Sequence, residues 1–379
     1  MKAVVVGGGI GGLTAAVALR QAGVETVVFE RTPESKELGL GLHLAINAMR
    51  ALRELGLADE VARRAGTPVE RMLFLNYRGR VLSEWPVVEL TKRFGVPALA
   101  VTRPTLQRVL VEAAGDALRM GTEVVRFEQD EDGVTARLAD GGEERADFLV
   151  GADGIWSQTR TALIGDSGLR YSGFTTARAI VDFDEAQAPR GLLRQHWGRG
   201  AVFVSYRVPD GRLFWVAATR TEGAPNGEAA LDKRSLLERY REFVAPVPAI
   251  LEATPEELIV SVSAQDRVPV DHWGEGRVTL LGDAAHPMNP TQGQGACQAI
   301  EDAVVLGKSV RTHGDVVGAL RAYEERRIPR SSKFVRQSRL IGATGRWQNP
   351  LACALRDQLL RLGGKRAFAR TGKEMAYEF

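Results

Sequence analysis

The sequence predicts an α/β protein in which an N-terminal domain is interrupted by an inserted antiparallel sheet and followed by a helical segment. Three observations predict this fold. A strand, a glycine-rich turn and a helix open the chain at 1–22, alternating aromatic-rich strands occupy 171–263, and helical periodicity runs from 298 to about 346. A further apolar strand at 277–281 returns the chain to the first domain.

The first twelve residues, MKAVVVGGGIGG, place an apolar strand at 3–6 directly before a Gly-x-Gly-x-x-Gly turn. In such a turn, the first glycine permits the sharp bend, the second lets the backbone approach a pyrophosphate, and the third lets the helix pack closely on the strand. The helix that follows presents free N–H groups and partial positive charge to the anion. We therefore expect a Rossmann-like domain that binds an adenine dinucleotide through Gly7, Gly9, Ile10, Gly11 and Gly12.

The second strand, 26–29, ends in Glu30, at the distance where a carboxylate accepts hydrogen bonds from a ribose diol, and Arg31 follows it. An acid rather than an arginine here favours an unphosphorylated ribose. Glycine triplets also arise by chance in a chain with 41 glycines, but here the strand, the helix and the acid agree. The turn alone does not distinguish NAD from FAD.

Residues 39–151 are predicted to alternate helices and strands. We expect an extended segment at 39–44, a helix at 47–55, strands between 72 and 101, a helix opened by Thr102 as N-cap with Pro104 in its first turn, and strands at 123–127, 134–138 and 148–151. The sequence DGGEE predicts a hairpin turn between the last two strands.

The inserted segment 171–263 is predicted to form its own antiparallel sheet, because its strands alternate in polarity and one pair is joined by Asp210-Gly211. Alternation places successive side chains on opposite faces of a strand. One face of the strand at 201–208 therefore carries Val202, Val204 and Tyr206, and the other carries Phe203, Ser205 and Arg207.

Composition indicates an ordinary globular protein of 379 residues, with 44% hydrophobic and 26% charged residues and a net charge of +3. No basic stripe interleaved with aromatics predicts nucleic-acid binding. Two distant cysteines, Cys297 and Cys353, support neither a disulfide framework nor a metal site, and they fit a reducing cytoplasm. The first strand begins at once and no apolar run approaches the ~20 residues of a membrane span, so we expect a soluble protein without a membrane partner.

The C-terminal stretch from Arg326 to Lys373 carries thirteen Lys or Arg and one acid, Asp357. Solvated helix faces are the preferred interpretation of this charge. Attraction for an anionic nucleotide, substrate or partner is the alternative.

Two further loops carry chemistry. The strand at 278–281 runs into Gly282-Asp283, and a glycine-rich segment at 290–297 then opens a helix. A carboxylate after a strand binds a sugar hydroxyl, and a helix start binds an anionic ring oxygen. A third loop, at 151–154 (Gly-Ala-Asp-Gly), is followed by Ser157 and Arg160. We expect these loops and the N-terminal turn to converge on one extended ligand.

The order of these motifs resembles the class A flavoprotein monooxygenases, the FAD-dependent aromatic hydroxylases, over at least residues 1–330. The Gly39, Gly41, His43 and Asn47 spacing is similar to the salicylate, hydroxynicotinate and urate hydroxylase branch. The resemblance implies a doubly wound FAD-binding domain at 1–170 and 264–330, with a short strand insertion near 72–101, a substrate-binding sheet domain at 171–263 and a C-terminal helical segment at 331–379. Ile46 departs from the proline of many relatives, which leaves the local turn open.

The resemblance also implies which residues hold tightly bound FAD. Glu30 would hold the adenosine ribose, Arg103 and Gln107 the diphosphate or ribose region, and Asp283 the ribityl or pyrophosphate part. The Asp-Gly motif serves both FAD and transient NAD(P)H in this family, and no second Gly-x-Gly-x-x-Gly is present. The remaining candidates are Arg31, His43, Val125, Asp153, Pro290, Gly293, Gln294, Gly295, Ala296 and Cys297.

The activity that the resemblance implies is hydroxylation of a small aromatic or heteroaromatic substrate. NAD(P)H would reduce the flavin, O₂ would add to it, and the resulting C4a-hydroperoxide would pass one oxygen to an electron-rich ring. The protein must position that ring and exclude water. An aromatic pocket wall is available in the inserted sheet, with sheet core as the alternative for each member: Trp197, Phe203, Phe214 and Trp215.

The catalytic candidates are His43, Arg178, Tyr206 and Phe214. His43, with an ordinary pKa of about 6.5, is expected to accept a phenol proton or to contact the flavin, with a structural role as the alternative. Arg178 and Tyr206 are expected to meet an anionic or phenolic substrate, with a solvated strand face as the alternative. His286 lies within the Gly-Asp motif, where flavin proximity and a supporting role are both open.

Three other functions stay open at this point. The first is an epoxidase or tailoring oxygenase of a larger natural product, and the second is an FAD-dependent reductase. The third is a non-catalytic FAD-binding regulatory protein. No serine or cysteine lies in the setting of a catalytic nucleophile. The protein is expected to be a monomer or a homodimer.

Overall fold

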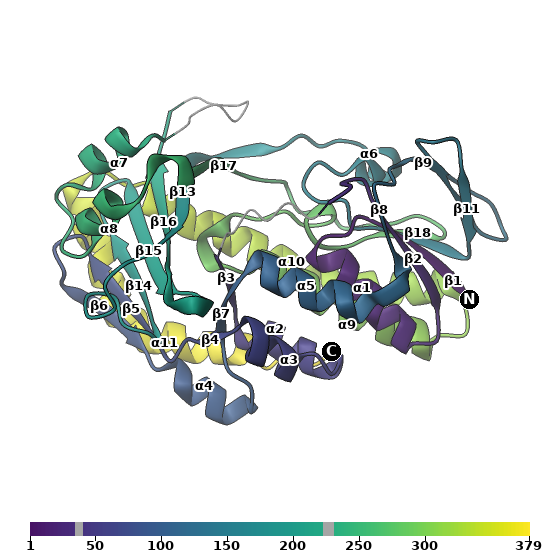
Figure 1. The fold of residues 1–379 in the computed structure, drawn as a ribbon, viewed down its shortest axis with the longest axis horizontal. Helices are drawn as coiled ribbons and strands as arrows, with labels where there is room; N and C mark the ends of the chain where they lie inside the picture. Colours follow the sequence, from purple (N-terminus) through teal and green to yellow (C-terminus); the bar gives the residue numbers. More distant parts are fainter. Residues whose placement is uncertain (35–40, 223–230) are drawn as a thin grey trace.

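The computed structural model describes residues 1–34, 41–222 and 231–379. At one end of the molecule lies a parallel five-stranded sheet in the order β18-β12-β1-β2-β8 (Figure 1). These strands are short and buried, as expected for a parallel sheet covered on both faces. Their bounds are β1 (Lys2–Val6), β2 (Glu25–Glu30), β8 (Leu118–Met120), β12 (Phe148–Gly151) and β18 (Val278–Leu280).

Three helices cover one face of this sheet: α1 (Ile10–Gln21), α5 (Arg103–Ala114) and α9 (Gly295–Thr312). Helices α1 and α9 approach closely because small residues face each other. A Cβ on Gly307 would lie 2.9 Å from the Cβ of Ala18. Helix α5 begins as predicted, with the Thr102 hydroxyl accepting from the Thr105 N–H at 3.4 Å.

A small antiparallel sheet covers the opposite face, formed by β9 (Val124–Gln129), β10 (Val134–Leu138) and β11 (Glu143–Ala146), and α6 (Gln158–Ile164) contacts β9. The predicted hairpin between 134–138 and 148–151 is wrong in its second strand: β10 pairs with β11, and 148–151 is β12 of the parallel sheet. Glu143 and Glu144 belong to β11 rather than to the turn, and Glu144 forms a 2.7 Å ion pair with Lys2.

A seven-stranded sheet forms the other end of the molecule, in the order β17-β13-β16-β15-β14-β5-β6. Strands β5 and β6 lie at 71–85, where the sequence analysis placed an insertion in the nucleotide-type domain. They instead extend the inserted sheet, because β5 pairs in parallel with β14. The bounds are β5 (Arg71–Asn76), β6 (Val81–Trp85), β13 (Arg170–Val181), β14 (Leu192–Trp197), β15 (Ala201–Arg207), β16 (Leu213–Arg220) and β17 (Val260–Asp266).

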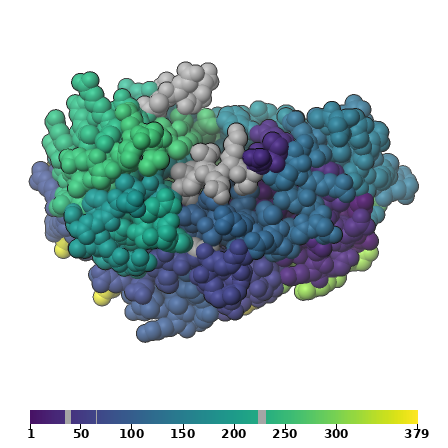
Figure 2. All heavy atoms as spheres, viewed as in Figure 1, coloured from purple at the N-terminus to yellow at the C-terminus, as the bar shows by residue number. Residues whose placement is uncertain are grey.

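The two faces of the large sheet pack on different cores, as the alternation predicts. Phe203 and Trp215 stack at a ring-centroid distance of 5.7 Å on the face covered by α7 (Lys233–Tyr240) and α8 (Val247–Ala253). Tyr206 and Phe214 lie on the other face and join the core of the parallel-sheet region. In the view of Figure 2, the teal and green atoms of this sheet region abut the blue and purple N-terminal region.

A third small sheet connects these two regions. It consists of β3 (Gly41–Leu44), β7 (Leu99–Thr102) and β4 (Thr67–Pro68), with β7 in the centre. Helix α2 (Ile46–Glu54) follows β3 directly, which resolves the turn that Ile46 left open. Helices α3 (Ala58–Ala65) and α4 (Val87–Phe94) complete this region.

Two long helices end the chain: α10 (Val316–Gly345) and α11 (Pro350–Glu374). Helix α10 is continuous through residues 330 and 331, where the sequence analysis placed a boundary, and it packs on α9. Helix α11 packs on β6. Short 3-10 turns are η1 (Gly115–Ala117), η2 (Pro209–Gly211), η3 (Glu256–Leu258), η4 (Gly282–Ala284) and η5 (Pro290–Gln292). Across the described ranges, every helix is too short or too polar to cross a bilayer.

Candidate active site

The N-terminal glycine turn has the geometry that its sequence predicts. Gly7 has φ +108°, and a Cβ there would lie 2.5 Å from the Ala152 carbonyl oxygen. A Cβ on Gly12 would lie 1.9 Å from the Gly7 carbonyl oxygen. A Cβ on Gly9, in contrast, would meet no described atom within 4 Å. Gly7 and Gly12 are therefore required by the protein's own packing, while the backbone at Gly9 is open to a ligand.

Glu30 and Gln107 both hold the peptide of Gly8, inside this turn. The Gly8 N–H donates to Glu30 Oε2 at 2.7 Å, and Gln107 Nε2 donates to the Gly8 carbonyl at 3.3 Å. The other Glu30 oxygen accepts from the Thr32 N–H at 2.9 Å. The structure thus brings both candidates to the loop that carries Gly9, and the carboxylate is already oriented by two backbone donors.

Four of the other predicted cofactor-binding residues lie on the exposed surface. Arg31 follows β2, Arg103 is the first residue of α5, and Pro290 opens η5. Val125, on β9, is 45% exposed.

Asp283 lies on η4 at the end of β18, with its side chain accessible to solvent. Surrounding protein raises the pKa of this carboxyl by desolvation, and the charges of His286 and Arg103 oppose the rise. Asp283 Oδ1 lies 3.8 Å from where a Cβ on Gly295 would stand. The carboxylate therefore faces the first turn of α9, as the motif predicts.

The first turn of α9 leaves its backbone accessible. Gly293 has φ +62°, and a Cβ there would meet only the Cβ of His43, at 4.0 Å, among described atoms. Gly295 and Ala296 are half-buried. The Cys297 thiol is buried and donates to the Gly293 carbonyl at 3.5 Å, and burial raises its pKa to about 12. Its side chain therefore braces the turn rather than reacting.

The side chain of Gln294 points away from the open backbone of this turn. Its side chain is 4% exposed, and its Oε1 accepts from Asn47 Nδ2 at 3.0 Å and from Gln298 Nε2 at 3.1 Å. The prediction that Gln294 contacts the cofactor is wrong for its side chain, because α9 directs that side chain into the protein interior. Its amide helps to lock α2 against the start of α9.

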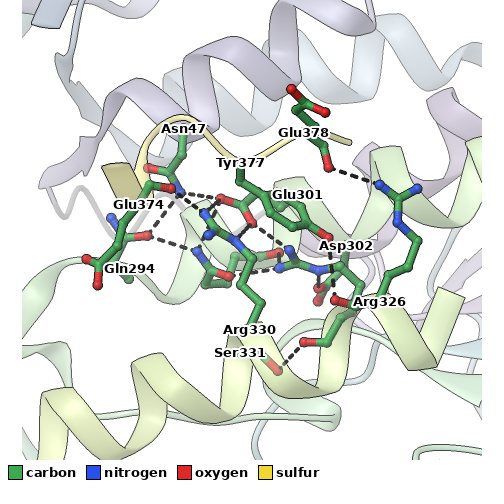
Figure 3. Close-up of polar contacts among 12 residues, drawn as sticks. Asn47, Gln294, Glu301, Asp302, Arg326, Arg330, Ser331, Glu374, Tyr377 and Glu378 are labelled. Carbon is green, nitrogen blue, oxygen red and sulfur yellow. Dashed lines mark hydrogen bonds and ion pairs between the residues drawn. The ribbon is translucent and has the colours of Figure 1, made fainter. Parts of the chain in front are cut away.

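Next to Gln294 lies a buried polar network that links α9, α10 and α2 (Figure 3). Glu301 accepts from Asn47 Nδ2, Arg327 Nη1 and Arg330 Nε, each at 2.6 Å. Asp302 accepts from Arg327 Nε, also at 2.6 Å. Arg327 is 0% exposed. Part of the basic C-terminal charge is therefore neutralised inside the protein and does not form solvated helix faces.

His286 belongs to the same network. Its Nε2 lies 2.6 Å from Asp302 Oδ2, which also accepts from the Gly282 N–H at 3.0 Å. Burial raises the pKa of Asp302, but His286 and Arg327 outweigh it and bring the pKa to about 2. His286 is 3% exposed and holds the Gly-Asp loop through Asp302, which is the supporting role that the sequence had left open.

The Asp-Gly loop is held in a similar way. Asp153 Oδ1 accepts from the Ser157 hydroxyl at 2.5 Å, and its Oδ2 accepts from Thr159 N and Oγ1 at 3.0 Å. Arg160 is buried and donates to the carbonyls of Ala284 and Ala285 at 3.0 and 2.9 Å. These contacts tie the 151–154 loop to the Gly-Asp loop, so the two motifs meet in space as predicted.

The large sheet contributes a patch of side chains from three strands. Register places Arg178 opposite Val216 and Val216 opposite Val204, and the next row is Ile180, Phe214 and Tyr206. Directly paired residues share a face. Arg178, Tyr206 and Phe214, three of the predicted catalytic residues, therefore lie together.

This patch faces the strand that carries His43. A Cβ on Gly41 would lie 2.4 Å from Phe214 Cγ, so Phe214 packs against β3. Gly41 and His43 share a face of β3. Burial, and then the charge of Arg103, lower the pKa of Arg178, and its Nε is buried without a hydrogen-bond partner among the described residues.

His43 closes the space between the patch and α9. Its Nε2 is buried without a partner within the described residues, and burial lowers the pKa of the imidazole to about 4. The ring is therefore neutral near pH 7 and accepts or donates one hydrogen bond at Nε2. An orphaned ring nitrogen beside Gly293 and Phe214 is positioned for a ligand between the two domains.

The expected aromatic wall is only partly present. Phe214 faces this space, but Phe203 and Trp215 lie on the opposite face, where Trp215 donates to the Thr254 hydroxyl at 3.0 Å. Trp197 packs with Phe74 and Leu82 in a separate cluster. Phe203 and Trp215 were wrongly expected in the wall, because strand alternation separates faces but does not say which face meets the nucleotide domain. Trp197 was also wrongly expected there: it lies opposite Val202 on the Tyr206 face, but it packs into the separate cluster.

The arrangement fits FAD. The open backbone at Gly9, the oriented Glu30, the accessible Asp283 and the free backbone at Gly293 lie on loops that meet in space, and the orphaned His43 lies beyond them. An extended dinucleotide with an anionic ring satisfies each of these groups. The fold and the site define the class of protein, a flavoprotein in which these loops would hold FAD next to the seven-stranded sheet.

Comparison with known proteins identifies the family. Residues 1–338 match the model of the FAD binding domain family. The chain is 40% identical over 380 residues to aurachin C monooxygenase/isomerase of Stigmatella aurantiaca, covering 100% of this chain and 98% of that protein. It is 36% identical over 369 residues to 3-hydroxybenzoate 6-hydroxylase 1 of Aquipseudomonas alcaligenes, covering 94% and 92%.

The similarity to solved structures identifies the same family. Klebsiella pneumoniae HpxO, solved in complex with FAD and uric acid, superposes with a TM-score of 0.91 and 32% identity, covering 99% of this chain and 96% of that one. The chain belongs to the FAD binding domain family and is a class A flavin monooxygenase, an FAD-dependent oxidoreductase. The predicted family, fold class and FAD cofactor are confirmed, and a non-catalytic regulatory role is set aside.

The network around Glu301 and Asp302 was not predicted from the sequence. A signal was present, because the helix QAIEDAVVL places two adjacent acids within an otherwise apolar run. Buried acids of this kind require cationic partners. The partners Arg327 and Arg330 lie 26 and 29 residues from Glu301 on another helix, so only the fold identifies them.

Proposed function

We propose that this enzyme hydroxylates a small aromatic or heteroaromatic substrate that is anionic or phenolic, using NAD(P)H and O₂. The observation that carries the proposal is Arg178, a largely buried guanidinium with an unpartnered Nε beside Tyr206 and Phe214. A buried cation without a carboxylate partner is costly unless a ligand supplies the charge. Bound FAD supplies the redox chemistry, drawing electrons from NAD(P)H to activate O₂.

In this proposal the protein's own residues bind and orient the substrate. Arg178 pairs with its anionic or carbonyl oxygen, Phe214 packs against its ring, and Tyr206 donates a hydrogen bond, because burial raises the pKa of the phenol and keeps it protonated. His43 is neutral and accepts a hydrogen bond from the substrate phenol at Nε2, directly or through water, because burial lowers its pKa to about 4 and disfavours the imidazolium that full proton transfer would form. The sheet at 171–263 is then the substrate-binding side of the enzyme.

The test uses purified, FAD-loaded protein. NAD(P)H oxidation should rise when the right compound is added from a panel of phenols, salicylates, hydroxypyridines and purines, and one atom of ¹⁸O₂ should appear in the product. Arg178→Met should keep FAD and lower kcat/KM by about 10- to 100-fold, the value of a lost charged hydrogen bond. An unlabelled product, or NAD(P)H oxidation that no aromatic changes, would exclude the proposal.

Arg194→Met is the matched control for this variant. Arg194 lies opposite Ser205 on the other face of the same sheet and donates to the Gln187 carbonyl at 2.6 Å. The Arg194→Met variant should therefore have the same kcat/KM as the parent enzyme. Equal losses from both variants would show that the Arg178 effect is structural.

A second candidate is monooxygenation of a larger natural product. It is favoured by the 40% identity to aurachin C monooxygenase/isomerase over nearly the full length of both proteins. The same ¹⁸O₂ assay with larger ring systems distinguishes it, because the preferred substrate is the one with the highest kcat/KM.

A further inference from the structure

Helix α11 exposes a row of four leucines. Leu351, Leu355, Leu359 and Leu362 are 81%, 58%, 58% and 73% exposed. Spacings of four, four and three residues place them on one side of the helix. We call these residues the leucine row. Large apolar side chains exposed together are unusual on a soluble surface and indicate an interaction site.

The opposite side of α11 is firmly seated on the protein. Its buried residues include Cys353, Arg356 and Gly364, and α11 contacts β6. A Cβ on Gly364 would lie 2.1 Å from the Ser83 hydroxyl, so the helix cannot rotate about its axis without steric conflict. Arg356 donates to the Gly198 carbonyl at 3.0 Å. The leucine row therefore faces outward in a fixed orientation.

Basic side chains border the leucine row. Five exposed basic residues follow in the second half of the helix: Arg361, Lys365, Arg366, Arg370 and Lys373. The two acids of α11 are already engaged, Asp357 with Arg356 and Glu374 with Lys333 and Arg370. Lys365 and Arg366 have no acidic partner in the described part of the chain.

We propose that α11 docks on an anionic phospholipid surface. A helix with leucines on its outward side and Lys or Arg beside them lies in the plane of a bilayer interface, with the leucines among the acyl chains and the cations at the phosphates. Because α11 is packed on β6, its leucine side already faces outward, and docking needs no rearrangement of the helix. The proposal revises the expectation of no membrane partner, and it does not depend on the proposed reaction.

Charge favours a lipid surface over a second copy of the chain. In a two-fold dimer the same patch meets itself. Pairing through the leucine row would bring the unpartnered Lys365 and Arg366 of each copy towards a surface that offers no unengaged acid on α11. An anionic bilayer supplies the missing negative charge along the whole helix.

The test is sedimentation of the FAD-loaded, full-length protein with vesicles. Vesicles of phosphatidylglycerol and phosphatidylcholine should bind it, vesicles of phosphatidylcholine alone should bind far less, and added salt should weaken the binding. Absence of binding to anionic vesicles at low salt overturns the proposal, and so does equal binding to both vesicle types.

Two variants locate the binding. Lys365→Glu with Arg366→Glu should lower vesicle binding by about 25-fold or more, since each basic residue near an anionic surface contributes about fivefold. Leu355→Ser with Leu362→Ser should lower it by about tenfold per leucine.

Matched controls lie outside α11, on or beside α7 and on η3 and β17. Arg234→Glu with Arg241→Glu changes the net charge equally, from +3 to −1. Leu258→Ser with Val262→Ser removes exposed apolar groups elsewhere. Both controls should bind vesicles like the parent.

Analytical ultracentrifugation provides the second readout. If the leucine variant converts a dimer to a monomer while the parent ignores anionic vesicles, the row is a contact between copies and the proposal is wrong. An unchanged oligomeric state with lost vesicle binding supports it.

Discussion

The buried side chain of His43 makes the stability of the folded protein depend on pH. Burial lowers its pKa to about 4, whereas an unfolded chain has a histidine pKa of about 6.5. Below pH 6.5 the unfolded chain binds a proton that the folded chain does not bind. The free energy of unfolding therefore falls as pH drops from about 6.5 to about 4. His196, whose pKa burial also lowers to about 4, adds to this loss in the same window.

His43→Asn should remove part of this acid sensitivity. Measured by urea unfolding with tryptophan fluorescence, the variant should lose less stability than the parent between pH 6.5 and 4.5. His272→Asn, at an exposed position, is the control. Parallel curves for His43→Asn and the parent would show that His43 is not held neutral by the fold.

At the scale of elements, two positions of the same turn are glycine for different physical reasons. Gly12 packs its helix against the turn, because a Cβ would lie 1.9 Å from the Gly7 carbonyl. Gly9 meets no described atom within 4 Å and has no strain of its own. The sequence pattern treats both as members of one motif, and the structure separates a folding role from a ligand role.

Gly9→Ala should therefore keep the fold and weaken FAD binding, because the added methyl meets the ligand and not the protein. Gly12→Ala should destabilise the protein itself. Flavin fluorescence titration measures the FAD affinity of Gly9→Ala, and thermal unfolding with and without FAD measures the stability of Gly12→Ala. Gly314→Ala, which also meets nothing within 4 Å but lies between α9 and α10, should change neither. Normal FAD affinity in Gly9→Ala would contradict this assignment.

At the scale of the whole molecule, the network around Glu301 joins distant segments to the flavin loops. Arg330 pairs with Glu301, donates to the Glu374 carbonyl at 2.9 Å and lies over the Tyr377 ring at 4.1 Å. Asn47 and Gln294 extend the network to α2 and the first turn of α9. The end of the chain is thereby connected to the turn that faces the flavin (Figure 3).

Glu301→Gln should destabilise the protein by about 3–5 kcal/mol, because it leaves Arg327 and Arg330 buried with one carboxylate fewer. Urea unfolding of the FAD-loaded enzyme measures this loss. Glu252→Gln, at an exposed position, should change the free energy of unfolding by less than about 0.5 kcal/mol. A small effect of Glu301→Gln would show that the network contributes little to stability.

The sequence by itself determined the features that depend on local geometry. The glycine turn, the Thr102 cap, the acid at Glu30 and the alternation that separates Tyr206 from Phe203 follow from backbone sterics and from periods of 3.6 and 2 residues. These features predict the fold class and an adenine dinucleotide, whereas FAD followed from the order of the glycine-turn, Asp-Gly and Gly-Asp motifs, which resembles the class A flavoprotein monooxygenases.

Only the tertiary structure decided what depends on contacts between distant segments. It placed β5 and β6 in the large sheet, turned Gln294 inward, and removed Phe203, Trp215 and Trp197 from the site. It also divided the basic C-terminal charge between a buried network and the exposed border of the leucine row. The physical reason is that burial and charge pairing are properties of packed neighbours, and local sequence does not encode which neighbours meet.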